Sequence, residues 1–500
     1  MLSKRRVKIV ATIGPATSSK ENLERCILAG MNVARLNFSH GSHEDHVKVI
    51  KHLRALSKEL KAPVSILQDL QGPKIRVGKF EEGSIQLKKD EVVVLTTDKV
   101  KGKPGLIPLD FEGLPNVCKP GQTILLDDGL LELEVVEVKG NEINAKVNHG
   151  GKLKDRKGLN VPGLSLPVEG LTSKDLKDLE FGISQHVDYV AMSFVRKPDD
   201  ITQLKEKLKE AGSDARVISK IEMFEAIENL EGIIDVSDAV MVARGDLAIE
   251  IGNSQLPVEQ KKIVKMCNEK GKPVIVATQM LDSMVENPRP TRAEVTDVAN
   301  GVLDGSDALM LSAETASGKY PFRCIRTMHE IVQEVENSYE FDYLKALKGG
   351  FMSVAESIAA SACLTAQNLK ASAIVCLTTS GKTATMISRY RPNSRIIALT
   401  HIIPTLNKLE VSWGIQTLPI NNYESSDEAM DQIEEKLLKY GLVKAGDKVI
   451  LTFGAPVLDQ AKTNTLRVYQ IKDRKLDQVD NKKLPLRCRP ISKLEDIEKA

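Results

Sequence analysis

Apolar, β-rich segments alternate with helix-like segments along most of this chain, and this alternation most limits how the chain can fold. The spacing predicts helices at 18–28, 44–60 and 172–184, the first with a serine cap. It predicts strands at 8–13, 32–38, 64–69, 189–194, 216–221, 239–242, 273–277 and 308–311. Eight strand–helix units favour a closed (β/α)8 barrel of the TIM type, in which active sites lie at the C-terminal strand ends.

The alternation breaks at residues 75–167, where short strand-like runs rich in Val, Leu, Gly and Lys are separated by turn signals. We interpret this stretch as a small β domain inserted into a barrel domain of residues 1–74 and 168–347. Alternation resumes at the helix 172–184. A separate alternating region, 348–471, predicts an open α/β sheet. Its expected helices are 354–369, 382–390 and 426–440, and its expected strands are 374–377, 395–399, 448–452 and 464–471. Residues 472–500 are charged and lack periodicity, so we expect a surface tail.

Size and charge exclude some classes of protein. A chain of 500 residues is too long for a single core and predicts two to four domains. The 70 Lys and Arg nearly cancel the 68 Asp and Glu, so bulk charge gives no argument for nucleic acid or an acidic membrane. We expect no membrane span, because no apolar run reaches about 18 residues. The seven cysteines contain no Cys-x-x-Cys pair, which argues against disulfides and zinc and favours the cytoplasm.

Lys220 and Glu222 lie two residues apart at the end of the predicted strand 216–221, so their side chains should share one face. A buried lysine is costly without an anionic partner, and a purely structural ion pair is one interpretation. Asp246 follows the predicted strand 239–242 in a similar way. Two carboxylates and a lysine at neighbouring strand ends suit a divalent cation and a phosphorylated or enolate substrate.

The second predicted strand carries Arg35, Asn37 and Ser39 at alternate positions, so we expect them on one face. A solvated edge strand would explain them. The functional alternative is a phosphate-binding arginine beside two neutral oxygen ligands, with Asp69 from the next strand end as a further oxygen ligand. Arg76 opens the inserted segment and could swing over the barrel mouth.

Three other features have both structural and functional interpretations. Thr278 follows a strand and is either a packed hydroxyl or part of a proton relay. The run Thr-Thr-Ser-Gly-Lys-Thr at 378–383 lies between a strand and a helix and suits a phosphate group, although it lacks the full phosphate-loop motif. His40, His43 and His46 have metal-like spacing, but we favour solvated or capping roles.

Six motifs, in order along the chain, resemble those of the pyruvate kinase family. They are 34–41 (ARLNFSHG), 218–222 (ISKIE), 241–247 (MVARGDL), 277–280 (ATQM), 290–300 (PTRAEVTDVAN) and 311–315 (LSAET). The resemblance extends over about residues 4–471. It implies a barrel, an inserted lid and a C-terminal effector domain. It also implies phosphoryl transfer from phosphoenolpyruvate to ADP in glycolysis, giving pyruvate and ATP, with Mg²⁺ or alternatively Mn²⁺.

The resemblance also implies roles for individual residues. Glu222 and Asp246 would hold the metal, and Lys220 would neutralise charge on the phosphoryl group and the enolate. Thr278 would lie near the enolate carbon that takes a proton. The substrate would contact Arg35, Lys220, Gly245, Asp246 and Thr278, and the nucleotide would contact Arg76, Lys157, Asn37 and His40.

Potassium and effector binding are two further implications of the resemblance. Asn37, Ser39, Asp69 and the Leu70 carbonyl would form a monovalent cation cage. Many members carry an acidic residue where this chain has Lys74, whose ammonium would replace potassium, so we expect potassium-independent activity. The family binds a sugar-phosphate effector at the positions of Thr378, Thr379, Ser380, Gly381, Lys382 and Thr383. Members are usually homotetramers, and we expect neither nucleic acid nor membrane as a partner.

Two competing functions remain at this point. A metal-dependent pyruvate aldolase would also hold a metal at barrel strand ends and form an enolate. It needs neither an inserted domain at 75–167 nor a lysine such as Lys220 beside the metal glutamate. A metabolite-sensing or scaffold protein without catalysis would not need to retain Lys220, Glu222, Asp246, Arg35 and Thr278 together.

Overall fold

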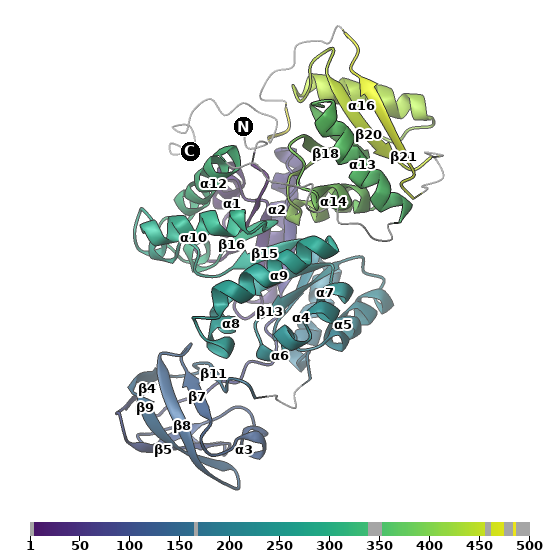
Figure 1. Cartoon of the computed structure of the whole chain (residues 1–500). Helices are drawn as coiled ribbons and strands as arrows, with labels where there is room; N and C mark the ends of the chain where they lie inside the picture. The colour runs from purple at the N-terminus through teal and green to yellow at the C-terminus, as the bar shows by residue number, and fades with distance from the viewer. Residues whose placement is uncertain (1–4, 165–168, 339–352, 456–461, 475–483, 487–500) are drawn as a thin grey trace.

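The computed structural model describes residues 5–164, 169–338, 353–455, 462–474 and 484–486. Figure 1 shows a central barrel, with a small β unit at one end and an α/β unit at the other. The domain boundaries predicted at 167/168 and 347/348 lie outside the described residues.

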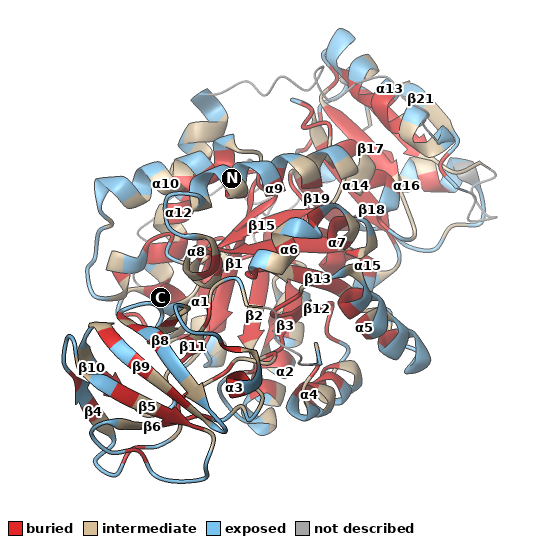
Figure 2. Ribbon diagram, turned by 60° about the horizontal axis from the view of Figure 1, so that its bottom comes forward, coloured by how far each residue is buried: buried red, intermediate tan, exposed pale blue. Residues whose placement is uncertain are grey.

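Eight parallel strands close into a barrel, which confirms the predicted fold class. They are β1 (Lys8–Ile13), β2 (Val33–Asn37), β3 (Ser65–Asp69), β12 (Tyr189–Met192), β13 (Arg216–Ile221), β14 (Ala239–Ala243), β15 (Val274–Ala277) and β16 (Ala308–Leu311). Strand β2 pairs with both β1 and β3, so the interpretation of this segment as a solvated edge strand is wrong. Figure 2 shows the barrel strands as almost entirely buried, which explains why their sequences are near-continuous apolar runs.

Helices surround the barrel (Figure 2). They are α1 (Lys20–Ala29), α2 (His43–Glu59), α4 (Ser173–Ser184), α5 (Pro198–Glu210), α6 (Phe224–Glu228), α7 (Leu230–Val236), α8 (Arg244–Ile251), α9 (Leu256–Lys270), the 3₁₀ turn η2 (Asp282–Val285), α10 (Arg292–Leu303), α11 (Ala313–Ala316) and α12 (Pro321–Ser338). Capping boxes fix several starts, including Ser42 with Asp45 before α2 and Thr172 with Asp175 before α4. These reciprocal hydrogen bonds satisfy backbone N–H groups at the helix entrance and explain why both starts were predictable.

The inserted segment forms a β unit with its own hydrophobic core, as predicted. A curled six-stranded sheet in the order β11-β7-β8-β9-β5-β6 accompanies a two-stranded sheet, β10-β4. The elements are β4 (Ser84–Leu87), β5 (Val92–Thr96), β6 (Leu106–Pro108), α3 (Leu114–Val117), β7 (Thr123–Leu126), β8 (Leu131–Lys139), β9 (Glu142–His149), β10 (Gly151–Lys154) and β11 (Leu159–Asn160). In Figure 1 this unit lies beside α6 and α8, which follow barrel strands β13 and β14. The inserted unit therefore sits near the C-terminal ends of the barrel strands.

The C-terminal unit is an open sheet in the order β19-β18-β17-β20-β21, with only β21 antiparallel. Its elements are α13 (Val354–Asn368), β17 (Ala373–Leu377), α14 (Lys382–Ser388), β18 (Arg395–Thr400), α15 (Ile403–Lys408), η4 (Leu409–Val411), β19 (Ile415–Pro419), α16 (Ser426–Lys439), β20 (Lys448–Phe453) and β21 (Thr465–Gln470). The predicted open α/β sheet is confirmed, but α15 and the edge strand β19 were not predicted. Both are short, and a proline occurs in each, which weakens their periodic signal.

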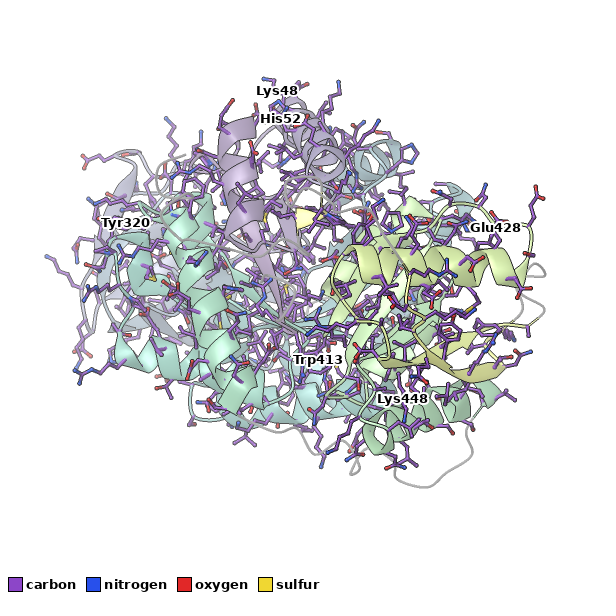
Figure 3. The ribbon with its side chains drawn as sticks, turned by 90° about the horizontal axis from the view of Figure 1, so that it is seen from above. Lys48, His52, Tyr320, Trp413, Glu428 and Lys448 are labelled. Carbon is purple, nitrogen blue, oxygen red and sulfur yellow. The ribbon has the colours of Figure 1, made fainter. Side chains whose placement is uncertain are left out.

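The C-terminal unit joins the barrel at the N-terminal ends of the barrel strands. Figure 3 shows Trp413 where the two units meet. The Trp413 backbone N–H donates to Asp307 Oδ1 at 2.9 Å, just before β16. The Arg391 guanidinium donates to both Asp307 oxygens at 3.0 Å and lies 4.9 Å from the centre of the Trp413 ring. This buried junction is at the opposite end of the barrel from the candidate site residues.

Part of the predicted surface tail is not on the surface. Leu484, Pro485 and Leu486 are buried. Leu484 packs in the core of the C-terminal unit and Leu486 in the core shared with the barrel, while the Leu486 N–H donates to the Leu60 carbonyl. Two leucines around a proline give no periodicity, so the sequence did not reveal this contact. The remainder of the tail beyond Arg474 lies outside the described residues.

Six cysteines are described, and all are buried free thiols. Burial alone raises the pKa of the Cys118 thiol to about 11. Within the described residues, the helices are too short or too polar to span a bilayer.

Candidate active site

Lys220 lies near the end of strand β13 and Glu222 follows its last residue, with Lys220 Nζ 3.4 Å from Glu222 Oε2. The same ammonium lies 3.3 Å from Asp69 Oδ1 at the end of β3. Burial opposes the charge of Lys220, but Asp69 and Glu222 outweigh it and raise the pKa of this lysine. Lys220 is therefore a permanent ammonium at neutral pH, as the strand pattern required.

The Glu222 carboxylate is fully buried. Burial raises the pKa of Glu222 to about 7, against the opposing effect of Lys220. Oxygen Oε1 accepts a hydrogen bond of 2.7 Å from the Phe194 backbone N–H, whereas Oε2 has no hydrogen-bond partner. A buried carboxylate oxygen without a donor is rare and costly, and it suits a bound cation.

Asp246 lies in the first turn of α8 rather than in a loop. Its Oδ1 is 2.8 Å from Lys74 Nζ, and the same ammonium is 3.7 Å from Asp128 Oδ1 in the inserted β unit. Burial opposes the charge of Lys74, but Asp246 outweighs it and raises the pKa of Lys74. Lys74 therefore brings a fixed positive charge to the point where barrel and inserted unit meet.

Arg35 and Asp69 form a second ion pair at the strand ends, with Arg35 Nε 2.7 Å from Asp69 Oδ2. Arg35 Nη1 also donates to Thr12 Oγ1 at 2.9 Å, and Thr12 was not predicted as part of the site. Asp69 thus bridges two cations, and the coulombic attraction of Lys220 and Arg35 lowers its pKa despite the opposing effect of burial. Ion pairs join β2, β3 and β13, and the Arg35–Thr12 hydrogen bond adds β1.

The four residues of the expected cation cage come from the neighbouring strand ends of β2 and β3, where Asn37 pairs with Asp69. Strand β2 ends at Asn37, so Ser39 lies in the following turn and the alternation argument does not apply to it. Asn37 Oδ1 accepts the Ser39 backbone N–H at 3.1 Å. The Leu70 carbonyl accepts a hydrogen bond of 2.7 Å from Ser193. The Asp69 oxygens are paired with Arg35 and Lys220.

Thr278 follows β15 in the left-handed region, with φ 71°, which is an outlier for a β-branched residue. Its hydroxyl donates to the Ala277 carbonyl at 2.6 Å and accepts the Gly245 backbone N–H at 2.9 Å. The hydroxyl thereby ties β15 to the start of α8, where Asp246 lies. Strain of this kind at a strand end is typical of functional sites.

Ser193 was not predicted as a site residue. It follows β12, and its hydroxyl lies 2.6 Å from Lys220 Nζ. A signal was present in the sequence, because Ser193 is a polar residue near the end of the predicted apolar strand 189–194, just as Asp69 is at the end of β3.

Of the residues expected to bind a nucleotide, Asn37 lies beside Asp69 at the strand ends, whereas Arg76 and Lys157 make their contacts elsewhere. The Arg76 guanidinium donates to the Arg156 carbonyl, and Lys157 Nζ is 2.7 Å from Asp127 Oδ1, so both bind within the inserted unit. His40 lies in the turn after β2. The other two histidines of that motif have structural partners: His43 contacts Asp178 at 2.7 Å, and His46 stacks on Phe38. Their contacts support the non-metal interpretation.

The segment 378–383 lines a cavity of about 820 Å³ in the C-terminal unit. Its walls include Thr378, Thr379, Ser380, Lys382 and Thr383 together with Phe453, Gly454, Lys462, Thr463 and Asn464. Gly381 takes φ 80° and donates its N–H to Thr378 Oγ1, which folds the segment into a tight turn. The described lining contains two lysines and no carboxylate, a composition that suits an anion.

In the described part of the chain, no cluster of three or more His, Cys, Asp or Glu side chains could hold a metal alone. Mg²⁺ does not require one, because it is commonly bound by one or two carboxylates together with water and substrate oxygens. Glu222, with its unpartnered oxygen, and Asp246 therefore fit a Mg²⁺ site that a phosphorylated substrate completes.

Comparisons with known proteins agree with this geometry. The family profile "Pyruvate kinase, barrel domain" matches residues 4–325, and "Pyruvate kinase, alpha/beta domain" matches residues 356–469. A pyruvate kinase of Bacillus licheniformis is 45% identical over 474 residues, covering 94% of this chain and 81% of the relative. One from Geobacillus stearothermophilus is 44% identical over 477 residues with the same coverage.

A solved structure extends the likeness to three dimensions. The crystal structure of a pyruvate kinase from Cryptosporidium parvum superposes with a TM-score of 0.89 at 35% sequence identity, covering 94% of this chain and 97% of that one. Because the profiles, the relatives and the fold agree over nearly the whole chain, it belongs to the pyruvate kinase family of phosphotransferases.

Proposed function

We propose that this chain transfers the phosphoryl group of phosphoenolpyruvate to ADP, giving pyruvate and ATP, with Mg²⁺ bound at the site. The observation that carries the proposal is the contact of Lys220 Nζ with Glu222 Oε2 at 3.4 Å, together with the absence of any hydrogen bond to that oxygen. Phosphoryl transfer asks the protein for positioning and charge neutralisation rather than covalent chemistry. A permanent ammonium beside a buried carboxylate whose second oxygen accepts no hydrogen bond supports this chemistry.

Glu222 and Asp246 would hold the metal. Bound Mg²⁺, or Mn²⁺ in its place, would supply positive charge that polarises the phosphoryl and carboxylate oxygens of the substrate. Because Asp246 Oδ1 contacts Lys74 at 2.8 Å, Lys74 must share or yield this oxygen when a metal binds.

Each basic residue has a defined task in this proposal. Lys220 neutralises charge on the phosphoryl group and on the enolate that it leaves. Arg35 grips the phosphoryl oxygens from β2. Gly245, whose N–H is donated to Thr278, would contact the substrate at the start of α8. Thr278 lies near the enolate carbon that takes a proton. Water can deliver that proton along the Thr278 hydroxyl.

The nucleotide would enter from the inserted unit. We assign Arg76 and Lys157 to ADP phosphates, with Asn37 and His40 on the barrel side. In the structure Arg76 and Lys157 contact other groups of the inserted unit, so nucleotide binding requires this unit to move as a lid. This proposal includes the division into a barrel (1–74 and 168–347), a lid (75–167), an effector domain (348–471) and a tail (472–500).

We propose that potassium is not required. Lys74 is 18% exposed and lies beside Asp246, where its ammonium supplies the positive charge that a monovalent ion would otherwise bring. In the expected cage, the Leu70 carbonyl accepts a hydrogen bond from Ser193, and Asp69 pairs with Arg35 and Lys220.

We propose that a sugar phosphate binds the cavity lined by 378–383. Two lysines without a facing carboxylate supply the charge, and the threonine and serine hydroxyls supply donors. The Ser380 carbonyl accepts a 2.8 Å hydrogen bond from Arg216, the first residue of β13, so the effector loop contacts the strand that carries Lys220. T379A and K382A should abolish activation by sugar phosphates, whereas unchanged activation would remove this assignment. Family membership alone supports a cytoplasmic homotetramer.

Pyruvate release coupled to a reporter enzyme tests the proposed function. With Mg²⁺ and phosphoenolpyruvate, pyruvate should form only when ADP is added, and K220M should lose the activity. An aldolase would release pyruvate from its own substrates without ADP. A scaffold protein would show no turnover in either variant.

A further inference from the structure

Two consecutive residues, Ser193 and Phe194, contact both charged side chains at the end of β13. Ser193 Oγ lies 2.6 Å from Lys220 Nζ, and the Phe194 backbone N–H lies 2.7 Å from Glu222 Oε1. Strand β12 pairs with β13 in parallel and places Met192 opposite Ser219, so the dipeptide runs alongside the segment from Lys220 onward. The dipeptide Ser193–Phe194 therefore contacts both the Lys220 ammonium and the Glu222 carboxylate.

The direction of the hydrogen bonds around Ser193 follows from chemistry. An ammonium can only donate, so Ser193 must accept from Lys220. Its own proton then goes to the Leu70 carbonyl at 2.7 Å, in preference to Asp69 Oδ1 at 3.4 Å. Ser193 is 2% exposed, so water does not compete for these bonds. The hydroxyl is held on one side by β3 and presents its lone pair to Lys220.

The backbone at this point is unusual. Phe194 has φ 56°, a left-handed conformation that is rare for a bulky residue. On the other side Gly72, at φ 70°, approaches so closely that a Cβ there would lie 2.8 Å from the Phe194 ring and 3.0 Å from Ser193 Cβ. A glycine and a left-handed phenylalanine together allow the turn to sit against both β3 and β13. Backbone strain retained at a strand end is a feature of functional sites.

We propose that Ser193 is a positioning residue for the phosphoryl-transfer reaction. Its hydroxyl holds the Lys220 ammonium in place, while the Phe194 N–H fixes Glu222 Oε1 and so directs Oε2 toward the metal. This inference rests on the proposed function, because it requires Lys220 to act on the transferring group. Without the hydroxyl, Lys220 Nζ keeps only the carboxylates of Asp69 and Glu222 as close partners among the described contacts. The ammonium then shifts toward those carboxylates and away from the substrate.

The alternative is that Ser193 merely satisfies a buried lysine. A structural role would change the melting temperature and leave the balance between kcat and KM unchanged. A positioning role changes kcat, because the ammonium acts mainly on charge that develops in the transition state. The two roles therefore predict different kinetics.

The test compares S193A, S193C and S193T with a matched control, S219A. Ser219 is a buried serine on β13 whose hydroxyl bonds to Ser237 instead of to a charged group. S193A should lower kcat about 10- to 100-fold, as expected for losing a hydrogen bond to a charged group, with KM for phosphoenolpyruvate changing less than about threefold. S193T should recover most of kcat, and S193C, which keeps the size but is a poor acceptor, should lie between.

The affinity of the free chain for Mn²⁺, measured by electron paramagnetic resonance, should be the same in S193A as in the parent, because Glu222 keeps its Phe194 contact. The proposal is overturned if kcat of S193A stays within about twofold of the parent, or if S219A loses as much as S193A. K220M is assayed in parallel. If K220M keeps full turnover, the proposed function itself fails. If K220M is inactive while S193A has the parent's kcat, only the proposed role of Ser193 fails.

Discussion

Replacing Lys74 should convert a potassium-independent enzyme into one that needs potassium. The ammonium lies 2.8 Å from Asp246 and 3.7 Å from Asp128, and the side chain is only 18% exposed. Lys74→Gln removes the charge and keeps most of the side-chain volume. Lys74→Glu adds a carboxylate beside Asp246 and should increase the demand for a cation further.

The magnitude follows from the contact that is lost. A hydrogen bond between charged groups is worth about 1.5–3 kcal/mol, and each 1.4 kcal/mol on the barrier is about tenfold in rate. K74Q should therefore lose about 10- to 150-fold in kcat without potassium. Potassium would restore much of this, with Asn37, Ser39, Asp69 and the Leu70 carbonyl as its ligands. The raised pKa of Lys74 keeps this side chain charged, and the parent therefore potassium-independent, across the neutral range.

The assay is coupled pyruvate release in tetramethylammonium buffer, with and without added potassium, for the parent, K74Q, K74E and a control, K79Q. Lys79 is exposed on the inserted unit, and its removal should leave the potassium response unchanged. A parent rate that rises about tenfold or more with potassium would refute the reasoning. So would a K74Q variant that keeps the full rate without potassium.

Three further predictions concern metal binding and stability. Since burial raises the pKa of Glu222 to about 7, protonation should weaken Mn²⁺ binding to the free chain as pH falls below about 7, and a constant affinity from about pH 6 to 8 in titration calorimetry would contradict this. R391M leaves the buried Asp307 carboxylate without its ion pair and should destabilise the fold by about 3–5 kcal/mol in chemical unfolding, whereas the more exposed pair broken by K205Q should cost under about 1 kcal/mol. L486A should cost about 2–5 kcal/mol and speed hydrogen exchange of the backbone N–H at position 486, which donates to the Leu60 carbonyl. Unchanged exchange of that N–H would show that the contact does not depend on the buried side chain.

The barrel was predictable because its strands are buried on both faces and read as apolar runs. Strand β13 was predicted at its observed bounds, and the alternation of side chains along it placed Lys220 beside Glu222. Strand β19 escaped prediction because it is a short edge strand ending in Pro419. Leu484 and Leu486 escaped because a contact made after a long irregular segment leaves no periodic pattern.

Site residues were predictable where they lie at the ends of predicted strands. They were not predictable where contacts between distant parts of the chain bring side chains together. The pair of Lys74 and Asp246 joins residues 172 positions apart, and only the closed barrel with its inserted unit brings them together. The left-handed backbone at Phe194 and Thr278 gives no sequence signal, because neither residue type favours it. Ser193 did leave a signal, as a polar residue near the end of the predicted apolar strand 189–194.

The central claim is that the carboxylates of Glu222 and Asp246 share one cation beside Lys220. Anomalous diffraction from crystals soaked in Mn²⁺ with a non-hydrolysable phosphoenolpyruvate analogue tests it directly. The account predicts one manganese peak within about 2.5 Å of Glu222 Oε2 and an Asp246 oxygen, with Lys220 Nζ facing the analogue. A manganese ion bound elsewhere, or an Asp246 that remains paired only with Lys74 while the analogue is bound, would contradict it.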